Sequence, residues 1–152
     1  MRNFTDQIRI AETDEERRAI FAFRYRVYIE EMGKPYKNAD HENKLLTDEL
    51  DDCATLLYVE TDNEIIGTVR INWGCEEKVM SFYNNLDLAL PYFSHFPSNL
   101  FSFNSRLMTS LAYRNTLLPK NLAEESYRLG RENGVYFNFI SCKPILRSFL
   151  SD

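Results

Sequence analysis

Residues 101–141 carry two apolar segments with a helix-forming segment between them. The first, residues 101–112, and the second, residues 135–141 (VYFNFIS), have the apolar and aromatic side chains of strands. Pro119 favours a helix start, because a first helical residue has no partner for an N–H, and Gly134 favours its end. A strand, a helix of about 15 residues and a strand predict a βαβ unit with two parallel strands.

The first half of the chain predicts antiparallel pairing. Residues 54–60 and 64–73 are rich in Leu, Ile, Val and Thr, and the intervening Thr61-Asp62-Asn63 has turn chemistry, so we expect a β-hairpin. A short strand is expected at residues 7–11. Thr13 and Glu16 have the spacing of a capping box, so a helix should begin near Asp14 and end at Gly33 and Pro35.

The remaining segments are shorter. Residues 36–52 are polar and acidic without clear period, which favours an irregular loop, and short helices are expected at residues 81–90 and 144–150. At 152 residues and 44% hydrophobic, the chain has enough apolar material for one core. The predicted fold class is therefore α/β (α+β), a mixed central sheet flanked by helices in a single domain over residues 1–152.

Composition and charge exclude several classes of function. A net charge of -5 argues against nucleic acid as the main partner, because the phosphate backbone favours a basic face. No apolar run reaches the length of a membrane span and no signal peptide is present, so we expect a cytoplasmic protein. Three cysteines, odd in number and far apart, fit neither a disulfide framework nor a metal site, and no metal is expected.

Several motifs recur in one order along the chain. They are Arg24-Tyr-Arg-Val-Tyr28 followed by Glu-Glu-Met-Gly33, Asp40-His-Glu42, Leu46-Thr-Asp-Glu-Leu-Asp51, Gly67-Thr-Val-Arg70 and Ser105-Arg106. Together with the order of elements, they resemble the GNAT acyltransferase superfamily, and within it the N-acyl amino acid synthases and the acyl-homoserine-lactone (autoinducer) synthases. The resemblance covers about residues 10 to 150. It implies transfer of an acyl group, expected to be long, from a thioester to the amine of a small molecule.

The charged residues of these motifs are candidates for the acceptor site. Arg24 and Tyr28 are one helical turn apart, so both can face the same site. Asp48 and Asp51 can present two carboxylates toward arginine side chains, either to grip a zwitterionic substrate or to anchor the 36–52 loop. The sequence leaves both readings open. The candidates assigned a catalytic role are Asp51, Arg70, Ser105 and Arg106, and those assigned to substrate binding are Arg24, Tyr28, Asp48, Met108 and Thr109.

The chain also departs from the autoinducer synthases. Phe103 stands where they have a glutamate two residues before the serine of the Ser-Arg pair. Glu-Met-Gly33 stands where they have a tryptophan at the end of the first helix. An amino acid or another small amine is therefore expected as the acceptor, rather than S-adenosylmethionine.

The thioester side is predicted at the loop before the second long helix. GNAT enzymes are similar to one another in a glycine-rich loop there, whose amides hold the pyrophosphate of coenzyme A. Here Leu117 and Pro119 occupy the glycine positions, so we expect a single phosphodiester, as on the phosphopantetheine of an acyl carrier protein, with coenzyme A as the other donor. The cofactor-binding candidates are Arg114, Asn115, Thr116, Leu117 and Lys120. Further basic residues that could meet an acidic carrier are Arg128, Arg131, Lys143 and Arg147.

The mechanism implied by the resemblance is direct attack of the amine on the thioester. A main-chain N–H around Met108 or Thr109 is expected to hold the carbonyl oxygen, and the general base is left open between Asp51 and a water chain. Phe149 stands where many GNAT enzymes resemble one another in a thiol-protonating tyrosine. An inactive GNAT-like binding module and an acetyl-coenzyme A-dependent acetyltransferase are the alternatives.

The end of the chain is unusual for such a fold. Family members continue with two further strands, whereas here the sequence stops at Asp152. The apolar strand at 135–141 would then lack its outer neighbour. We expect either a truncated product or a homo-oligomer whose second subunit covers this edge.

Overall fold

The computed structural model describes residues 2–84 and 90–140. Its main sheet has five strands in the order β1-β4-β5-β6-β7, formed by Arg9–Ile10, Thr55–Thr61, Glu64–Trp73, Phe101–Thr109 and Phe137–Ile140. Neighbouring strands are antiparallel except β6 and β7, which are parallel and joined through a helix. The predicted fold class, hairpin and βαβ unit are confirmed.

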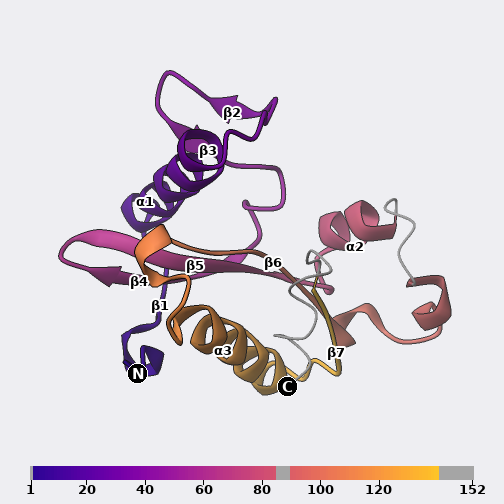
Figure 1. Cartoon of the computed structure of the whole chain (residues 1–152). Helices are drawn as coiled ribbons and strands as arrows, with labels where there is room; N and C mark the ends of the chain where they lie inside the picture. The colour runs from indigo at the N-terminus through magenta and orange to yellow at the C-terminus, as the bar shows by residue number, and fades with distance from the viewer. Residues whose placement is uncertain (1, 85–89, 141–152) are drawn as a thin grey trace.

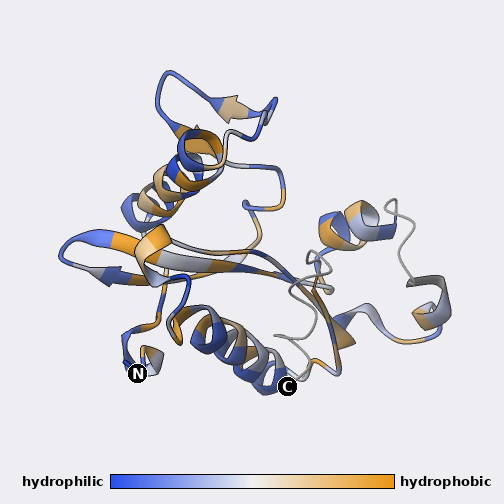
Figure 2. Ribbon diagram, viewed as in Figure 1, coloured by the Kyte–Doolittle hydropathy of each residue, from blue (hydrophilic) through white to orange (hydrophobic). Residues whose placement is uncertain are grey.

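Two long helices cover opposite faces of this sheet. Helix α1 (Asp14–Tyr25) lies on one face and α3 (Leu118–Glu132) on the other (Figure 1). Each turns apolar residues toward the strands and hydrophilic residues outward, as Figure 2 shows. The expected capping box at Thr13 starts α1, since its side chain accepts the N–H of Glu16 and the Glu16 carboxylate accepts the N–H of Thr13.

Three apolar clusters make up the core. Beneath α1, the buried side chains include Ile20, Phe23, Leu56, Tyr58 and Met108. Beneath α3, they include Leu57, Val69, Ile71, Leu118 and Leu122. A third, aromatic cluster lies on the α1 face under helix α2 (Glu77–Asn84), and it includes Val79, Tyr83, Phe101 and Phe103.

The structure corrects several element boundaries. The 36–52 loop contains a two-stranded hairpin, β2 (Ala39–Asp40) with β3 (Leu45–Leu46), on the far side of α1 from the sheet (Figure 1). Helix α2 begins at Glu77 rather than 81, because Val79 and Tyr83, four residues apart, both face the aromatic cluster. Residues 85–89, where that helix was expected to continue, and the helix predicted at 144–150 lie outside the described residues.

The first helix does not end as a single α-helix. After Tyr25 it continues as a π-helix, Arg26–Glu31, up to Gly33, whose φ of 60° ends it. Short 3-10 helices complete the described chain at Thr5–Gln7, Leu90–Phe93, Ser98–Leu100 and Leu111–Tyr113.

A β-bulge interrupts the pairing of β5 with β6. Thr68 pairs with Met108 and Arg70 with Ser105, so Val69 stands opposite both Arg106 and Leu107. Arg106 has a φ of 55°, in the left-handed region. Without the extra residue Ser105 and Arg106 would point to opposite faces; with it, both point to the α1 face, and Leu107 packs in the α3 cluster.

The sheet and α3 approach most closely at Gly67 of β5. A Cβ atom built there would lie 2.9 Å from Leu118 Cδ2 and 3.0 Å from Leu122 Cδ1, both on fully buried side chains. We expect Gly67→Ala to lower the free energy of unfolding by about 1–3 kcal/mol through overpacking. Gly130→Ala on α3 is the matched control, since its Cβ would have no neighbour closer than 3.7 Å and alanine favours a helix interior. Urea denaturation of both variants checks this, and equal stability of the two would contradict it.

No helix among the described residues is long and apolar enough to cross a membrane.

Candidate active site

Five charged side chains meet on the α1 face of the sheet. Asp51 Oδ1 accepts hydrogen bonds from Nη1 of Arg24 at 2.7 Å and from Nη1 of Arg70 at 3.1 Å. Asp48 bridges Arg70 and Arg106, because its Oδ1 accepts a hydrogen bond from Arg70 and its Oδ2 accepts one from Nη2 of Arg106 at 2.7 Å. Ser105 adds its hydroxyl, which accepts from Nε of Arg70 at 3.0 Å. The structure thus brings together six of the predicted site residues, from α1, the 36–52 loop, β5 and β6.

The loop that carries the two aspartates is fixed by its own backbone. Asp51 Oδ2 accepts the N–H of Asp48 at 2.9 Å, and Asp48 Oδ1 accepts the N–H of Leu50 at 3.0 Å. Asn72 of β5 donates to the carbonyl oxygen of Leu50 at 2.8 Å, and Arg17 of α1 donates to the carbonyl oxygen of Asp51. Both oxygens of Asp51 are therefore engaged, and the loop is held against the sheet.

This charged cluster, defined as Arg24, Asp48, Asp51, Arg70 and Arg106, has an uneven charge. Three guanidinium groups face two carboxylates. Arg24 is 1% exposed and Asp51 is 3% exposed, so solvent has little access to the end of the cluster formed by these two residues. The excess positive charge is therefore weakly screened there. Nε and Nη2 of Arg24 have no acceptor among the described residues. A buried cationic excess with unused donors favours an anionic group nearby.

The pKa values in the cluster follow these contacts. Burial raises the pKa of Asp48, but the guanidinium groups of Arg70 and Arg106 outweigh it and lower the pKa to about 2. Burial lowers the pKa of Arg24, and Asp51 offsets part of this. Burial also lowers the pKa of Arg106, but the hydrogen bond to Asp48 and the charge of Asp48 outweigh it and raise the pKa. With a pKa of about 2, Asp48 is ionised at neutral pH and is a weak proton acceptor.

Aromatic rings cover the outer end of the cluster. The Arg106 guanidinium lies 5.5 Å from the centroid of the Tyr28 ring and 5.3 Å from that of Tyr36. The two tyrosine rings are 5.2 Å apart, and Nζ of Lys34 lies 4.6 Å from the Tyr28 ring. Arg24 and Tyr28 do face one site, but at opposite ends of it: Arg24 binds Asp51 inside, and Tyr28 packs on Arg106 outside.

Three contributors were missed in the sequence. Tyr36 packs on Arg106, Arg17 holds the Asp51 backbone, and Tyr83 of α2 stacks on Phe103 beside Ser105. Burial raises the pKa of Tyr83, while the charge of Arg70 acts in the opposite direction. Tyr36 and Tyr83 lie in segments without a recognisable motif. Arg17 has the pattern of a surface residue of α1, so nothing in the sequence indicated these three residues.

The edge of β6 next to the cluster presents main-chain groups. Ser110 donates its N–H to Ile66 of β5, and alternation along a strand then directs the N–H of Met108 to β5 as well. The main-chain N–H and C=O groups of Thr109 point to the opposite edge of β6. There the carbonyl oxygen accepts a hydrogen bond from Nε of Arg114 at 3.4 Å. β7 pairs only with Phe101 to Asn104, so among the described residues no strand pairs with Ser105–Thr109 on the edge opposite β5.

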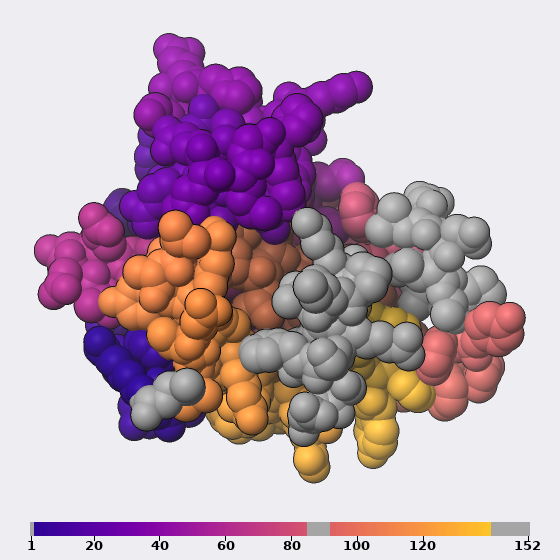
Figure 3. Space-filling view, viewed as in Figure 1, coloured from indigo at the N-terminus to yellow at the C-terminus, as the bar shows by residue number. Residues whose placement is uncertain are grey.

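The loop between β6 and α3 lies against the end of the first helix. Nη2 of Arg114 is 2.9 Å from Oε2 of Glu31, and Figure 3 shows this loop (orange) in contact with the α1 segment (violet). The N–H groups of Asn115, Leu117 and Lys120 have no acceptor among the described residues. Leu117 has a φ of −75°, a conformation open to any residue. This turn therefore fits phosphate oxygens despite lacking glycines.

Two of the three basic residues of α3, Lys120 and Arg128, are paired along the helix, and Arg131 is the third. Lys120 lies 3.8 Å from Glu124, and Arg128 forms ion pairs with both Glu125 and Glu132. Lys143 and Arg147 lie outside the described residues, as does Phe149. The described surface of α3 is therefore close to neutral rather than basic.

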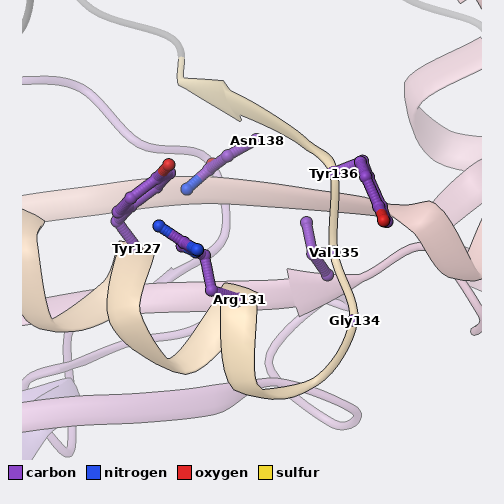
Figure 4. A pocket seen from close by; sticks show the side chains of 7 residues that line it. Tyr127, Arg131, Gly134, Val135, Tyr136 and Asn138 are labelled. Carbon is purple, nitrogen blue, oxygen red and sulfur yellow. The ribbon is translucent and has the colours of Figure 1, made fainter.

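Two other features lie apart from the cluster. A cavity of about 390 Å³ is lined by Tyr127, Gly130, Arg131, Gly134, Val135, Tyr136 and Asn138, between α3 and β7 (Figure 4). Over residues 2–84 and 90–140, no three His, Cys, Asp or Glu side chains are grouped as metal ligands.

The chain is similar to known acyltransferases in sequence and in fold. A sequence model described as "Acetyltransferase (GNAT) domain" matches residues 23–124. A search of curated proteins gave no match. The structure is similar to the CoA-dependent acyl-homoserine lactone synthase BjaI with SAM and isopentyl-CoA, at a TM-score of 0.68 and 16% identity. The similarity covers 87% of this chain and 61% of the synthase, so the chain spans about three fifths of that protein's length.

Two acetyltransferase structures are also similar. A predicted acetyltransferase with acetyl-CoA from Clostridium acetobutylicum has a TM-score of 0.59 and 12% identity, covering 93% of this chain and 84% of its own. An aminoglycoside acetyltransferase from an uncultured soil metagenomic sample, in complex with sisomicin, has a TM-score of 0.55 and 13% identity, covering 97% and 86%. At these identities the similarity establishes the fold alone, so conclusions about chemistry depend on the residues of the charged cluster.

Proposed function

Because the chain belongs to the acetyltransferase (GNAT) domain family, we propose that it is an N-acyltransferase. It moves an acyl group from an acyl thioester to the amine of an amino acid or similar small acceptor. The observation that carries this proposal is the charged cluster, whose cationic excess borders the free edge of β6.

The acceptor binds at the outer end of the cluster. Arg106 uses only Nη2 toward Asp48, and none of its other donors has a hydrogen-bond partner among the described residues. Its side chain is 16% exposed, and its guanidinium matches a carboxylate bidentately. Tyr28 and Tyr36 hold it from the other side. An acceptor carrying a carboxylate beside its amine, as an amino acid does, neutralises the excess charge of the cluster.

The roles of the aspartates are positional. Asp51 is buried with both oxygens engaged, so it aligns Arg24 and Arg70 rather than taking a proton from substrate. Asp48 orients Arg106, and its low pKa makes it a poor base. Arg70 and Ser105 complete the support beneath Arg106. The proton of the amine therefore leaves through water.

The donor is proposed to be an acyl-coenzyme A. The unbonded N–H groups of Asn115, Leu117 and Lys120 support phosphate binding, with the guanidinium of Arg114 beside them. The hydroxyl of Thr116 holds the turn, because it donates to the carbonyl oxygen of Tyr113 and accepts the N–H of Leu118. The balanced charges of α3 do not favour an acidic carrier protein. From this turn, the pantetheine arm runs along the free edge of β6, where its amides bond to main-chain groups as a strand would.

The reaction is a direct transfer. The neutral amine attacks the thioester carbon, and the oxygen that becomes negative is held by the N–H of Thr109 on the free edge of β6. The C–N bond forms as the C–S bond breaks, and the thiolate of coenzyme A leaves and takes up a proton from water. The chain supplies orientation and charge rather than a covalent intermediate.

A non-catalytic binding module remains the second candidate. The observation in its favour is that neither carboxylate of the cluster suits a general base, because Asp51 is fully engaged and Asp48 has a pKa of about 2.

Incubation with acyl-coenzyme A thioesters and a pool of amino acids separates the two candidates. We expect N-acyl amino acids, detected by mass, together with free coenzyme A in equal amount. Acyl carrier protein thioesters in a parallel reaction test the alternative donor. Binding of coenzyme A without product from any thioester would instead support the binding module.

A further inference from the structure

Helix α2 brings to the charged cluster a hydroxyl that takes no part in the reaction described above. Tyr83, near the end of this helix, is 8% exposed, and its ring stacks on Phe103 with 4.0 Å between the ring centroids and 8° between the planes. Phe103 and Ser105 are two residues apart on β6, before the bulge, so both side chains point to the α1 face. The stack therefore places the phenol of Tyr83 on the face of the sheet that carries the cluster.

The Tyr83 hydroxyl lies beside members of the charged cluster. Burial raises the pKa of Tyr83, and the charges of Arg70 and Arg106 lower it. Ser105 also lowers this pKa as a hydrogen-bond partner, whereas the charge of Asp48 raises it. The net effect is a pKa above the usual value, so the phenol keeps its proton at neutral pH. It is therefore a neutral hydrogen-bond donor among charged side chains.

The directions of the hydrogen bonds leave the proton of Tyr83 free. The Ser105 hydroxyl accepts from Nε of Arg70 at 3.0 Å, and a guanidinium group has no acceptor, so the proton of Ser105 is available to the Tyr83 oxygen. Tyr83 then accepts from Ser105, and its own O–H has no acceptor among the residues that the structure describes. Because buried donors are rarely left unpaired, this O–H favours a ligand that accepts a hydrogen bond.

The unused donors of Tyr83 and Arg106 suit the same ligand group. Asp48 and Asp51 do not serve Tyr83, because both carboxylates already accept from arginines and from main-chain N–H groups. Arg106 binds Asp48 through Nη2 alone and is partly exposed, so its other donors face the acceptor. A carboxylate has acceptor sites for a guanidinium and a phenol at once, and its negative charge offsets the cationic excess of the cluster.

We propose that Tyr83 is a specificity-determining residue of the acceptor site, and that its hydroxyl donates to the acceptor carboxylate beside the guanidinium of Arg106. This inference rests on the proposed acyltransferase function and deepens it, since it restricts good acceptors to amines that carry a carboxylate. An amine without that carboxylate leaves both donors unpaired, which is the kind of loss that gives a site strong discrimination.

Tyr83→Phe tests this inference, because phenylalanine keeps the ring on Phe103 and removes only the hydroxyl. With the amino acid that the wild type acylates fastest, we expect the KM for the acceptor to rise about tenfold and kcat to stay within about twofold, as the loss of one hydrogen bond to a charged group allows. With the matched amine, in which hydrogen replaces the carboxylate, the two proteins should give equal rates. Tyr92→Phe, at a tyrosine that is 82% exposed, is the control.

The outcomes are distinct. An unchanged KM for the amino acid in Tyr83→Phe, or an equal loss with the amine that lacks the carboxylate, would overturn the inference and leave the acyltransferase proposal standing. No product from the wild type with any thioester and acceptor would overturn both. Urea denaturation of Tyr83→Phe separates the two roles of the hydroxyl, since a hydroxyl with only a structural role lowers the free energy of unfolding and leaves the KM for the acceptor unchanged.

Discussion

Asp51→Asn is expected to lower the free energy of unfolding by about 3–5 kcal/mol, the range for breaking a buried ion pair from one side. Asp51 accepts from both Arg24 and Arg70, and all three side chains are at most 4% exposed. The neutral amide leaves two guanidinium groups inside the protein with too little negative charge. Because domains of this size are stable by about 5–15 kcal/mol, the change removes a large share of the total.

Asp52→Asn is the matched control for this prediction. Asp52 is the next residue, but its side chain is 77% exposed and pairs only with Lys78 on the surface. Its replacement should change the free energy of unfolding by less than about 0.5 kcal/mol. Urea denaturation followed by circular dichroism measures both variants. A loss below about 1 kcal/mol for Asp51→Asn would show that water, not Asp51, compensates the arginines.

Arg106→Ala is expected to lower kcat/KM for the amino acid acceptor by about 100-fold, which corresponds to about 2.7 kcal/mol of lost binding in the transition state. The loss should appear mainly as a raised KM for the acceptor, since the guanidinium binds its carboxylate. The KM for the thioester should stay within about twofold. Arg106→Lys should retain part of the effect, because an ammonium group keeps the charge but loses the planar fork.

The stability readout separates this role from a structural one. Arg106 is 16% exposed and pairs with Asp48, which is 21% exposed, so its removal should cost only about 1 kcal/mol. Arg26→Ala is the control, because this arginine lies near the same helix end but is 41% exposed and 4.0 Å from Glu64. An unchanged KM for every acceptor in Arg106→Ala would place the acceptor carboxylate elsewhere.

Local pattern was enough to predict most of the secondary structure. The capping box at Thr13, the turn at Asp62 and Asn63 and the helix end at Gly134 each act over a few residues, so the sequence alone carries their physics. The π-helix at Arg26–Glu31 and the start of α2 at Glu77 were missed, because packing against other segments decides them. The β2–β3 hairpin was missed because its strands are only two residues long.

The candidate site divides in the same way. The sequence by itself determined which residue types are available for the site. It shows the spacing of Asp48 and Asp51, the position of Arg70 on a hairpin strand, and the adjacent Ser105 and Arg106. Only the tertiary structure decided how these residues are arranged. The bulge turns Arg106 to the face of Ser105, burial makes Asp51 a support for two arginines, and glutamates along α3 pair with Lys120 and Arg128. Burial and partner choice depend on segments far apart in the chain, and these contacts form only when the chain folds.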